Sequence, residues 1–178
     1  MSVHRVRSPV DPSEIQSICQ VKYAYFRLLD LKRFTELGDL LLEDATTAYQ
    51  SGELRQSGRA AIVAFLQESL GDPGIVTMHN GHHPEIELMG EDGATGRWYL
   101  EDRVIVPAHD FEIHGTAIYE DRYAKVGGVW KIAHRSELVD WARTEPAADD
   151  WIKTSSEPPL GARGDADLSN QRERLRKL

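Results

Sequence analysis

The stretch TGRWYLEDRVIV, residues 95–106, alternates between two kinds of side chain with a period of two, which is typical of a β-strand with one buried face. Trp98, Leu100 and Asp102 share one face of this strand, and mainly charged side chains share the other. Asp102 is therefore predicted on the buried side, where an isolated carboxylate is unfavourable unless it is paired, hydrogen-bonded or protonated. Two interpretations stay open: a structural carboxylate paired with an internal arginine or tyrosine, or a carboxyl group in a pocket.

The same period continues on both sides of this stretch, from residue 75 to residue 141, and glycine-rich turns at 90–93 and 127–128 interrupt it. This pattern predicts an antiparallel sheet. Earlier in the chain, apolar residues recur at three- and four-residue steps, which predicts helices over about 12–30, 34–41 and 58–70, with a short strand at 45–50. We therefore predict an α+β domain in which three N-terminal helices pack on one face of a curved antiparallel sheet.

The length of 178 residues suits one well-filled core rather than two. We assign residues 1–10 to an N-terminal arm, 11–143 to the single domain, and 144–178 to a C-terminal arm or tail. The last segment contains several prolines and little apolar pattern. It is interpreted either as a solvated tail or as an arm that clasps a neighbouring subunit through Trp151 and Ile152.

Charge and hydropathy exclude several classes of function. The net charge is −8, and clustered lysines and arginines are missing from residues 1–160, so we expect no nucleic-acid partner. No apolar run approaches the roughly 20 residues needed to span a bilayer, and the start lacks an apolar signal core, so we expect a cytoplasmic protein without a membrane partner. A small, hydrophobic molecule is the expected ligand.

The familiar cofactor and nucleophile motifs are absent from the sequence. It contains no glycine-rich phosphate loop and no GxSxG elbow. The single cysteine, Cys19, lies at helical spacing among apolar residues, which indicates a buried thiol rather than a nucleophile. Acid and base chemistry is what remains.

The segment TMHNGHHPEIEL, residues 77–88, gathers three histidines and two glutamates. A metal site is not predicted here, because no HExxH helix is present, Gly81 and Pro84 indicate a bulge or bend, and His82 and His83 point to opposite sides of an extended chain. His79 is the remaining candidate. On spacing alone, it is either a catalytic base or a hydrogen-bonded part of the scaffold.

Asp30 follows an apolar run at the end of the first predicted helix, where it either caps the next helix or acts in a site. Tyr25 lies five residues earlier, about 140° around an ideal helix. The two side chains converge only if the helix ends or bends between them.

The order of elements, together with the segments YAYFRLLDLKRF, TMHNGHHPEIEL, GRWYLED and GVWKIAHRSELVDW, resembles the SnoaL-like branch of the NTF2-like superfamily over about residues 11–143. This cone-shaped α+β fold is shared by scytalone dehydratase, bile acid 7α-dehydratase, hexachlorocyclohexane dehydrochlorinase, polyketide cyclases and ketosteroid isomerase. The resemblance implies no cofactor and a homo-oligomer, with a trimer favoured over a dimer.

The resemblance also implies roles for individual residues. In the dehydratases and dehydrochlorinases, an aspartate after the first helix orients a histidine that removes a substrate proton, and Asp30 and His79 match these two places. Tyr25 and Asp102 match a tyrosine and an aspartate of the dehydratases. Tyr25 would donate to a carbonyl or leaving oxygen, with a neutral Asp102 as a proton donor beside it. The expected pocket residues are Tyr49, Phe65, Trp98 and His114.

Three functions remain possible at this point. The first is a cofactor-independent dehydratase or lyase that acts on a hydrophobic polycyclic or steroid-like hydroxy-ketone. The second is an isomerase or polyketide cyclase of the same fold. The third is a non-catalytic module for small-molecule binding or assembly, because a fold alone does not determine function.

Overall fold

The computed structural model describes the backbone of residues 11–145 and the side chains of residues 11–137. The helices are α1 (Pro12–Asp30), α2 (Phe34–Asp39) and α3 (Arg59–Leu70), and the strands are β1 (Leu41–Tyr49), β2 (Leu54–Ser57), β3 (Val76–Leu88), β4 (Gly93–Val106), β5 (Phe111–Val126) and β6 (Val129–Glu145). Two short 3-10 turns, η1 (Gln50–Gly52) and η2 (Pro107–His109), complete the described chain. Trp151 and Ile152 lie outside the described residues.

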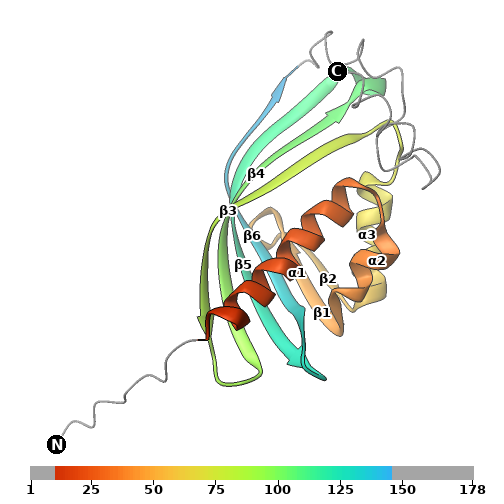
Figure 1. Cartoon of the computed structure of the whole chain (residues 1–178). Helices are drawn as coiled ribbons and strands as arrows, with labels where there is room; N and C mark the ends of the chain where they lie inside the picture. The colour runs from red at the N-terminus through yellow and green to blue at the C-terminus, as the bar shows by residue number, and fades with distance from the viewer. Residues whose placement is uncertain (1–10, 146–178) are drawn as a thin grey trace, which may run out of the picture.

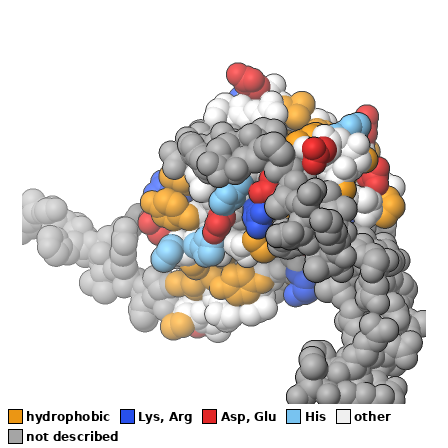
Figure 2. Space-filling model, turned by 90° about the horizontal axis from the view of Figure 1, so that it is seen from above, with side chains coloured by type: hydrophobic (Ala, Val, Ile, Leu, Met, Phe, Trp, Pro, Cys, Tyr) orange, Lys and Arg blue, Asp and Glu red, His pale blue; other side chains and the backbone are white. Residues whose placement is uncertain are grey.

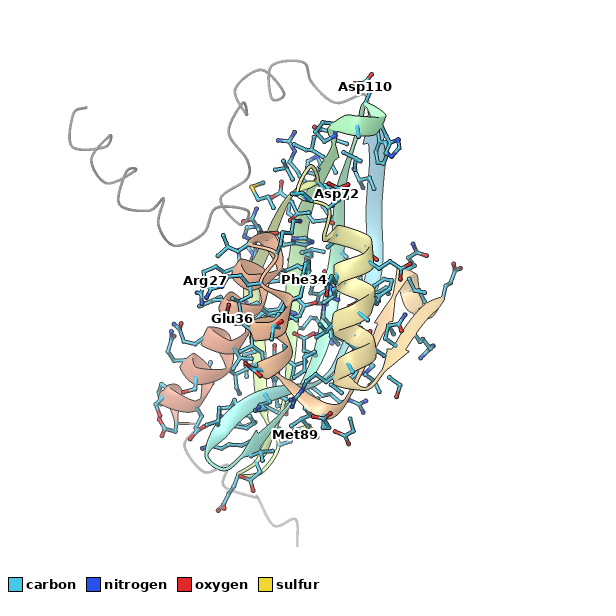
Figure 3. All side chains as sticks on the ribbon, turned by 90° about the vertical axis from the view of Figure 1, so that its right-hand side faces the viewer. Arg27, Phe34, Glu36, Asp72, Met89 and Asp110 are labelled. Atoms are coloured by element: carbon cyan, nitrogen blue, oxygen red, sulfur yellow. The ribbon has the colours of Figure 1, made fainter. Side chains whose placement is uncertain are left out.

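The strands form one six-stranded sheet in the order β2-β1-β6-β5-β4-β3. The sheet is strongly curved, and the helices lie on its concave side (Figure 1). Met89 and Asp110 mark opposite ends of the long strands, and α1 runs along the sheet between these ends (Figure 3). The α+β class and the curved sheet agree with the prediction.

Two features of the predicted architecture need correction. Only α1 and α2 precede the sheet, because β1 and β2 come before α3. The sheet is also not entirely antiparallel, since β1 pairs with β6 in parallel, with Thr46 opposite His134. Such a pair needs a long crossover, which α3 and the meander β3–β5 provide. The second helix ends at Asp39 rather than at residue 41, because Leu41 already belongs to β1.

The start of α1 follows from its first four residues. The Asp11 side chain accepts a hydrogen bond of 2.9 Å from the backbone N–H of Ser13, Pro12 takes the first turn, and Glu14 adds a negative charge there. The buried face of α1, including Ile18, packs against the concave side of the sheet. This packing fixes the direction in which the helix delivers its last residue, Asp30.

The core lies between α1 and the concave face of the sheet. Trp98 is completely buried, and Tyr25 and Tyr119 are exposed by only 1% and 2%. Cys19 is a buried free thiol, as predicted. Within residues 11–145, no helix is long and apolar enough to cross a membrane.

Candidate active site

Asp30 and His79 meet where the end of α1 reaches β3. The Nδ1 atom of His79 lies 2.6 Å from Oδ1 of Asp30, and the backbone N–H of His79 donates a bond of 3.0 Å to Oδ2. An ionised carboxylate only accepts hydrogen bonds, so Nδ1 carries the proton and Nε2 keeps a free lone pair. The arrangement therefore supplies an oriented base.

Packing holds this imidazole in place. Its side chain is only 7% exposed, whereas that of Asp30 is 25% exposed. The ring of Phe26, on the last turns of α1, stacks on it with 6.5 Å between ring centroids and an angle of 12° between planes. The same helix thus contributes both the carboxylate and the ring that limit the orientation of His79.

Asp102 lies beside His79, because the two residues are register partners in the β3–β4 pair. Burial raises the pKa of Asp102 above its ordinary value; His79 opposes this shift and the negative charge of Glu137 adds to it. Asp102 therefore holds a proton to higher pH than an exposed carboxyl group does. This is the property that a proton donor next to a base requires.

Tyr25 faces a different part of the concave side. Helix α1 continues unbroken to Asp30, so it does not bend between the two residues. The Tyr25 side chain is buried, and its hydroxyl interacts with that of Tyr49. Among the described residues, neither hydroxyl makes a hydrogen bond of normal geometry. Burial raises the pKa of Tyr25 well above its usual range, so its hydroxyl stays a proton donor.

Arg135 connects these tyrosines, although the sequence pattern did not single it out. Its guanidinium carbon lies 5.3 Å from the ring centroid of Tyr25, 4.8 Å from that of Tyr49 and 3.9 Å from that of Tyr119. The residue is 3% exposed, and one of its nitrogens lies 3.5 Å from a Glu137 oxygen. Its Nε has no hydrogen-bond partner within the described part of the chain. A buried cation with a free donor can receive an oxygen of a ligand.

A bulge explains why Arg135 faces inward. Tyr123 pairs with Ile132, but the preceding residue of β5, Arg122, pairs with His134, so Ala133 is an extra residue in β6. Trp130 and Ile132 are buried before the bulge, and Arg135 is buried after it. Strict alternation predicts Arg135 on the outer face. Only the register shift, which local sequence does not reveal, could have identified it.

The predicted pocket residues do not all come together. Trp98 is buried on the concave side, where its indole N–H donates a hydrogen bond of 3.1 Å to the Tyr123 hydroxyl. Tyr49 and Phe65 pack with 5.0 Å between ring centroids. His114 does not join them: it is opposite Arg103 in the β4–β5 pair, on the other face from Asp102, and its Nε2 lies 3.2 Å from Glu101.

The histidine-rich segment, residues 77–88, does not form one site. The register of β3 against β4 shifts between His82 and Glu85, which confirms the predicted bulge near Pro84. His82 is exposed, with its Nε2 3.7 Å from Glu101. Figure 2, which views the molecule from above relative to Figure 1, shows histidine and acidic side chains grouped near hydrophobic ones. Among the described side chains, no group of three or more His, Cys, Asp or Glu residues is arranged to hold a metal ion.

A separate groove crosses the outer face of the sheet. It has a volume of about 630 Å³ and is lined by charged side chains that include Glu85, Arg97, Glu120 and Arg122. Arg97 bridges Glu85 and Glu120 at 3.2 and 3.3 Å. These side chains alternate with the buried ones along each strand, so the groove lies on the opposite side of the sheet from His79. The candidate site therefore rests on the contacts of the concave face, not on this groove.

Comparison with known proteins gives a consistent result. The sequence profile of a family described as SnoaL-like domain matches residues 13–136. A candidate scytalone dehydratase from Novosphingobium aromaticivorans is 23% identical with a TM-score of 0.70, over 77% of this chain and 91% of that one. A hexachlorocyclohexane dehydrochlorinase from Novosphingobium barchaimii is 16% identical with a TM-score of 0.67, over 78% and 92%. The ActVI-ORFA protein of Streptomyces coelicolor is 14% identical with a TM-score of 0.61, over 72% and 98%. At these identities the three structures show a common fold.

Proposed function

Because the chain belongs to the SnoaL-like domain family of the NTF2-like superfamily, we propose that it is a cofactor-independent dehydratase or related lyase. Its substrate class is a hydrophobic polycyclic or steroid-like hydroxy-ketone. The observation that carries the proposal is the double contact of Asp30 with the ring and the backbone of His79, at 2.6 and 3.0 Å.

The reaction begins with proton removal. Nε2 of His79 takes a proton from the carbon next to the substrate carbonyl, and the electrons of the broken C–H bond form an enolate. The carboxylate of Asp30 stabilises the resulting imidazolium through the Nδ1 contact of 2.6 Å. A positioned base of this kind typically contributes about 10²- to 10⁴-fold to the rate.

Elimination then restores the carbonyl. The enolate electrons form a carbon–carbon double bond as the C–O bond to the hydroxyl group breaks. Asp102, whose pKa is raised by burial, is the group we assign as the proton donor to the departing hydroxide, so water leaves. The products are an unsaturated ketone and one water molecule.

Buried donors are available for the negative charge on the enolate oxygen. The Tyr25 and Tyr49 hydroxyls and Nε of Arg135 lack hydrogen-bond partners among the described residues, and all three groups are buried. Donors that are already oriented and desolvated stabilise developing charge better than water does. We assign this cluster to the carbonyl end of the substrate and the pair Asp30–His79 to the carbon that loses the proton.

Variants of the pair test the proposal. Turnover of hydroxysteroids and polyketide-like hydroxy-ketones is followed by product mass, and we expect His79→Ala and Asp30→Asn each to reduce kcat/KM by at least about 10²-fold. His82→Ala and Asp39→Asn serve as matched controls, because both residues are exposed. Full activity of either pair variant on an identified substrate contradicts the assignment.

Product mass also separates the dehydratase from its main alternative. An isomerase or cyclase of the same fold uses the same proton abstraction and the same enolate donors, but its product keeps the atoms of the water. A product with unchanged mass therefore assigns the pair to isomerisation. Binding without turnover across the substrate panel assigns the protein to the non-catalytic class.

A further inference from the structure

An unusual residue follows the end of helix α1, two positions after Asp30. Lys32 has a φ of 60°, in the left-handed region. Its backbone N–H donates to the Leu29 carbonyl at 3.1 Å, and that of Arg33 donates to the Leu28 carbonyl at 2.9 Å. These two bonds define a Schellman motif, in which glycine normally occupies the left-handed position because it has no Cβ. A lysine here is conformationally unfavourable, which indicates that its side chain has another use.

The side chain of Lys32 turns back toward β3. Its Nζ donates a hydrogen bond of 3.0 Å to Oγ1 of Thr77, a residue that is only 9% exposed. Thr77 lies two residues before His79 on the same strand, so both side chains project from the same face. The end of α1 is thus attached to β3 at two neighbouring points, one through Lys32 and one through Asp30.

The charge of Lys32 acts on the same site. Burial lowers the pKa of Lys32 to about 8, and the negative charge of Asp30 opposes that shift. The ammonium is therefore still charged at neutral pH, in partly desolvated surroundings next to the carboxylate. The titratable groups around the pair are Asp30 and Lys32 at the end of α1, His79 on β3 and Asp102 on β4. The charges of Glu137, His114 and Arg135 act in turn on Asp102.

We propose that Lys32 is a positioning residue: its hydrogen bond to Thr77 holds the end of α1 on β3, so that Asp30 stays against His79, and its positive charge disfavours proton uptake by the imidazole. A cation beside Asp30 offsets part of the attraction between that carboxylate and an imidazolium, so proton uptake by His79 becomes less favourable. The free base then remains available to abstract a proton. This inference rests on the proposed function, because it assigns Lys32 to the same site.

Three substitutions separate charge, hydrogen bonding and backbone strain. Lys32→Met removes the ammonium and keeps a long side chain, Lys32→Arg keeps the charge, and Lys32→Gly removes the whole side chain and relieves the left-handed backbone. Lys131→Met is the matched control, since Lys131 donates only to the backbone oxygen of Asp39 on the exposed surface.

The first measurement does not depend on turnover. In a ¹H–¹⁵N NMR titration, we expect the midpoint of His79 protonation to rise by about half a pH unit or more in Lys32→Met and Lys32→Gly, and to change little in Lys32→Arg and Lys131→Met. An unchanged midpoint in Lys32→Met overturns the proposal. A raised midpoint in a protein without lyase activity keeps the role of Lys32 and rejects the proposed function instead.

The second measurement concerns activity and stability together. With an identified substrate, the acid limb of the kcat/KM profile should move to higher pH in Lys32→Met and Lys32→Gly, with a loss of about threefold or more on that limb. Lys32→Gly should melt no lower than Lys32→Met, because it relieves the strained backbone. A residue that served only to end the helix would leave the activity profile unchanged in Lys32→Met and Lys32→Gly while glycine still raised stability, and this result overturns the proposal.

Discussion

At the scale of single residues, Asp102 has the property that most clearly distinguishes it from an ordinary surface carboxyl group. Burial raises its pKa, and a proton donor works only while it is protonated. Activity should therefore be lost as pH rises through the pKa of Asp102 in the folded protein. We expect Asp102→Asn to reduce kcat by about 10²-fold and to remove this basic limb, which a pH–rate profile measures. A basic limb that is identical in the variant contradicts the assignment of Asp102 as the acid.

Two tyrosines provide a second contrast at this scale. Among the described residues, the buried Tyr25 hydroxyl makes no hydrogen bond of normal geometry. The Tyr123 hydroxyl, in contrast, donates a hydrogen bond of 2.7 Å to Asp121 and accepts one from Trp98. We expect Tyr25→Phe to lower kcat by about 10²-fold with a smaller loss of stability than Tyr123→Phe, because the Tyr25 hydroxyl makes no hydrogen bond of normal geometry in the fold. Tyr123→Phe should instead lower the free energy of unfolding by about 1 to 3 kcal/mol with a smaller effect on kcat. Urea denaturation and turnover, measured on both variants, test these two expectations. A large loss of stability in Tyr25→Phe contradicts the assignment of its hydroxyl to the site.

At the scale of elements, the period of the sequence predicts the helices and the long strands because it reports which face of each element is buried. Asp102 was placed on the buried face of β4 in this way, beside Trp98 and Leu100. The parallel pairing of β1 with β6 and the extra residue at Ala133 were not predicted, since both depend on partners far away in the chain. That is why Arg135, which follows the bulge, was missed.

The contact between α1 and β3 yields a prediction at the same scale. A Cβ added to Gly81 would lie 2.4 Å from Cε2 of Phe26, so β3 approaches the helix there as closely as glycine allows. Phe26 also stacks on His79. We expect Gly81→Ala to destabilise the protein by about 1 to 3 kcal/mol and to reduce turnover, because the buried Phe26 ring that stacks on His79 must shift. Gly74→Ala is the control, since its added Cβ would meet only the exposed Asp72 side chain. The stability of both variants is measured by urea denaturation. Equal midpoints for Gly81→Ala and Gly74→Ala would contradict a tight contact between Gly81 and Phe26.

At the scale of the whole molecule, the candidate site joins residues from α1, β1, β3, β4 and β6 across the concave face of the sheet. Sequence reasoning named Asp30, His79 and Asp102 as site residues, but it could not give the 2.6 Å contact between the first two. Distances of this kind depend on how the helix docks on the sheet. The outward position of His114 has the same origin, because it follows from the pairing of β5 with β4.

The concave face also holds a fully buried ion pair, and removing one partner of such a pair is costly. Lys22 and Asp121 are fully buried, with 2.6 Å between Nζ and Oδ2, and burial lowers the pKa of Lys22 to about 8. Aromatic rings surround the ammonium, and that of Tyr119 is nearest at 4.4 Å. Lys22→Met should cost about 3 to 5 kcal/mol, because it leaves the Asp121 carboxylate buried without its counterion.

The double variant makes this prediction specific to the pair. Lys22→Met combined with Asp121→Asn leaves no uncompensated charge, keeps an acceptor for the Tyr123 hydroxyl and retains side chains of similar size. We therefore expect the double variant to be more stable than Lys22→Met alone, with a coupling of about 1 to 3 kcal/mol in a double-mutant cycle of urea denaturation. If the losses in the free energy of unfolding from the two single variants simply add in the double variant, Lys22 contributes by packing among the aromatic rings. In that case the charges of Lys22 and Asp121 would play no part in holding α1 on the sheet, which would be left to the apolar face of α1 and to its other polar contacts, such as that of Lys32 with Thr77.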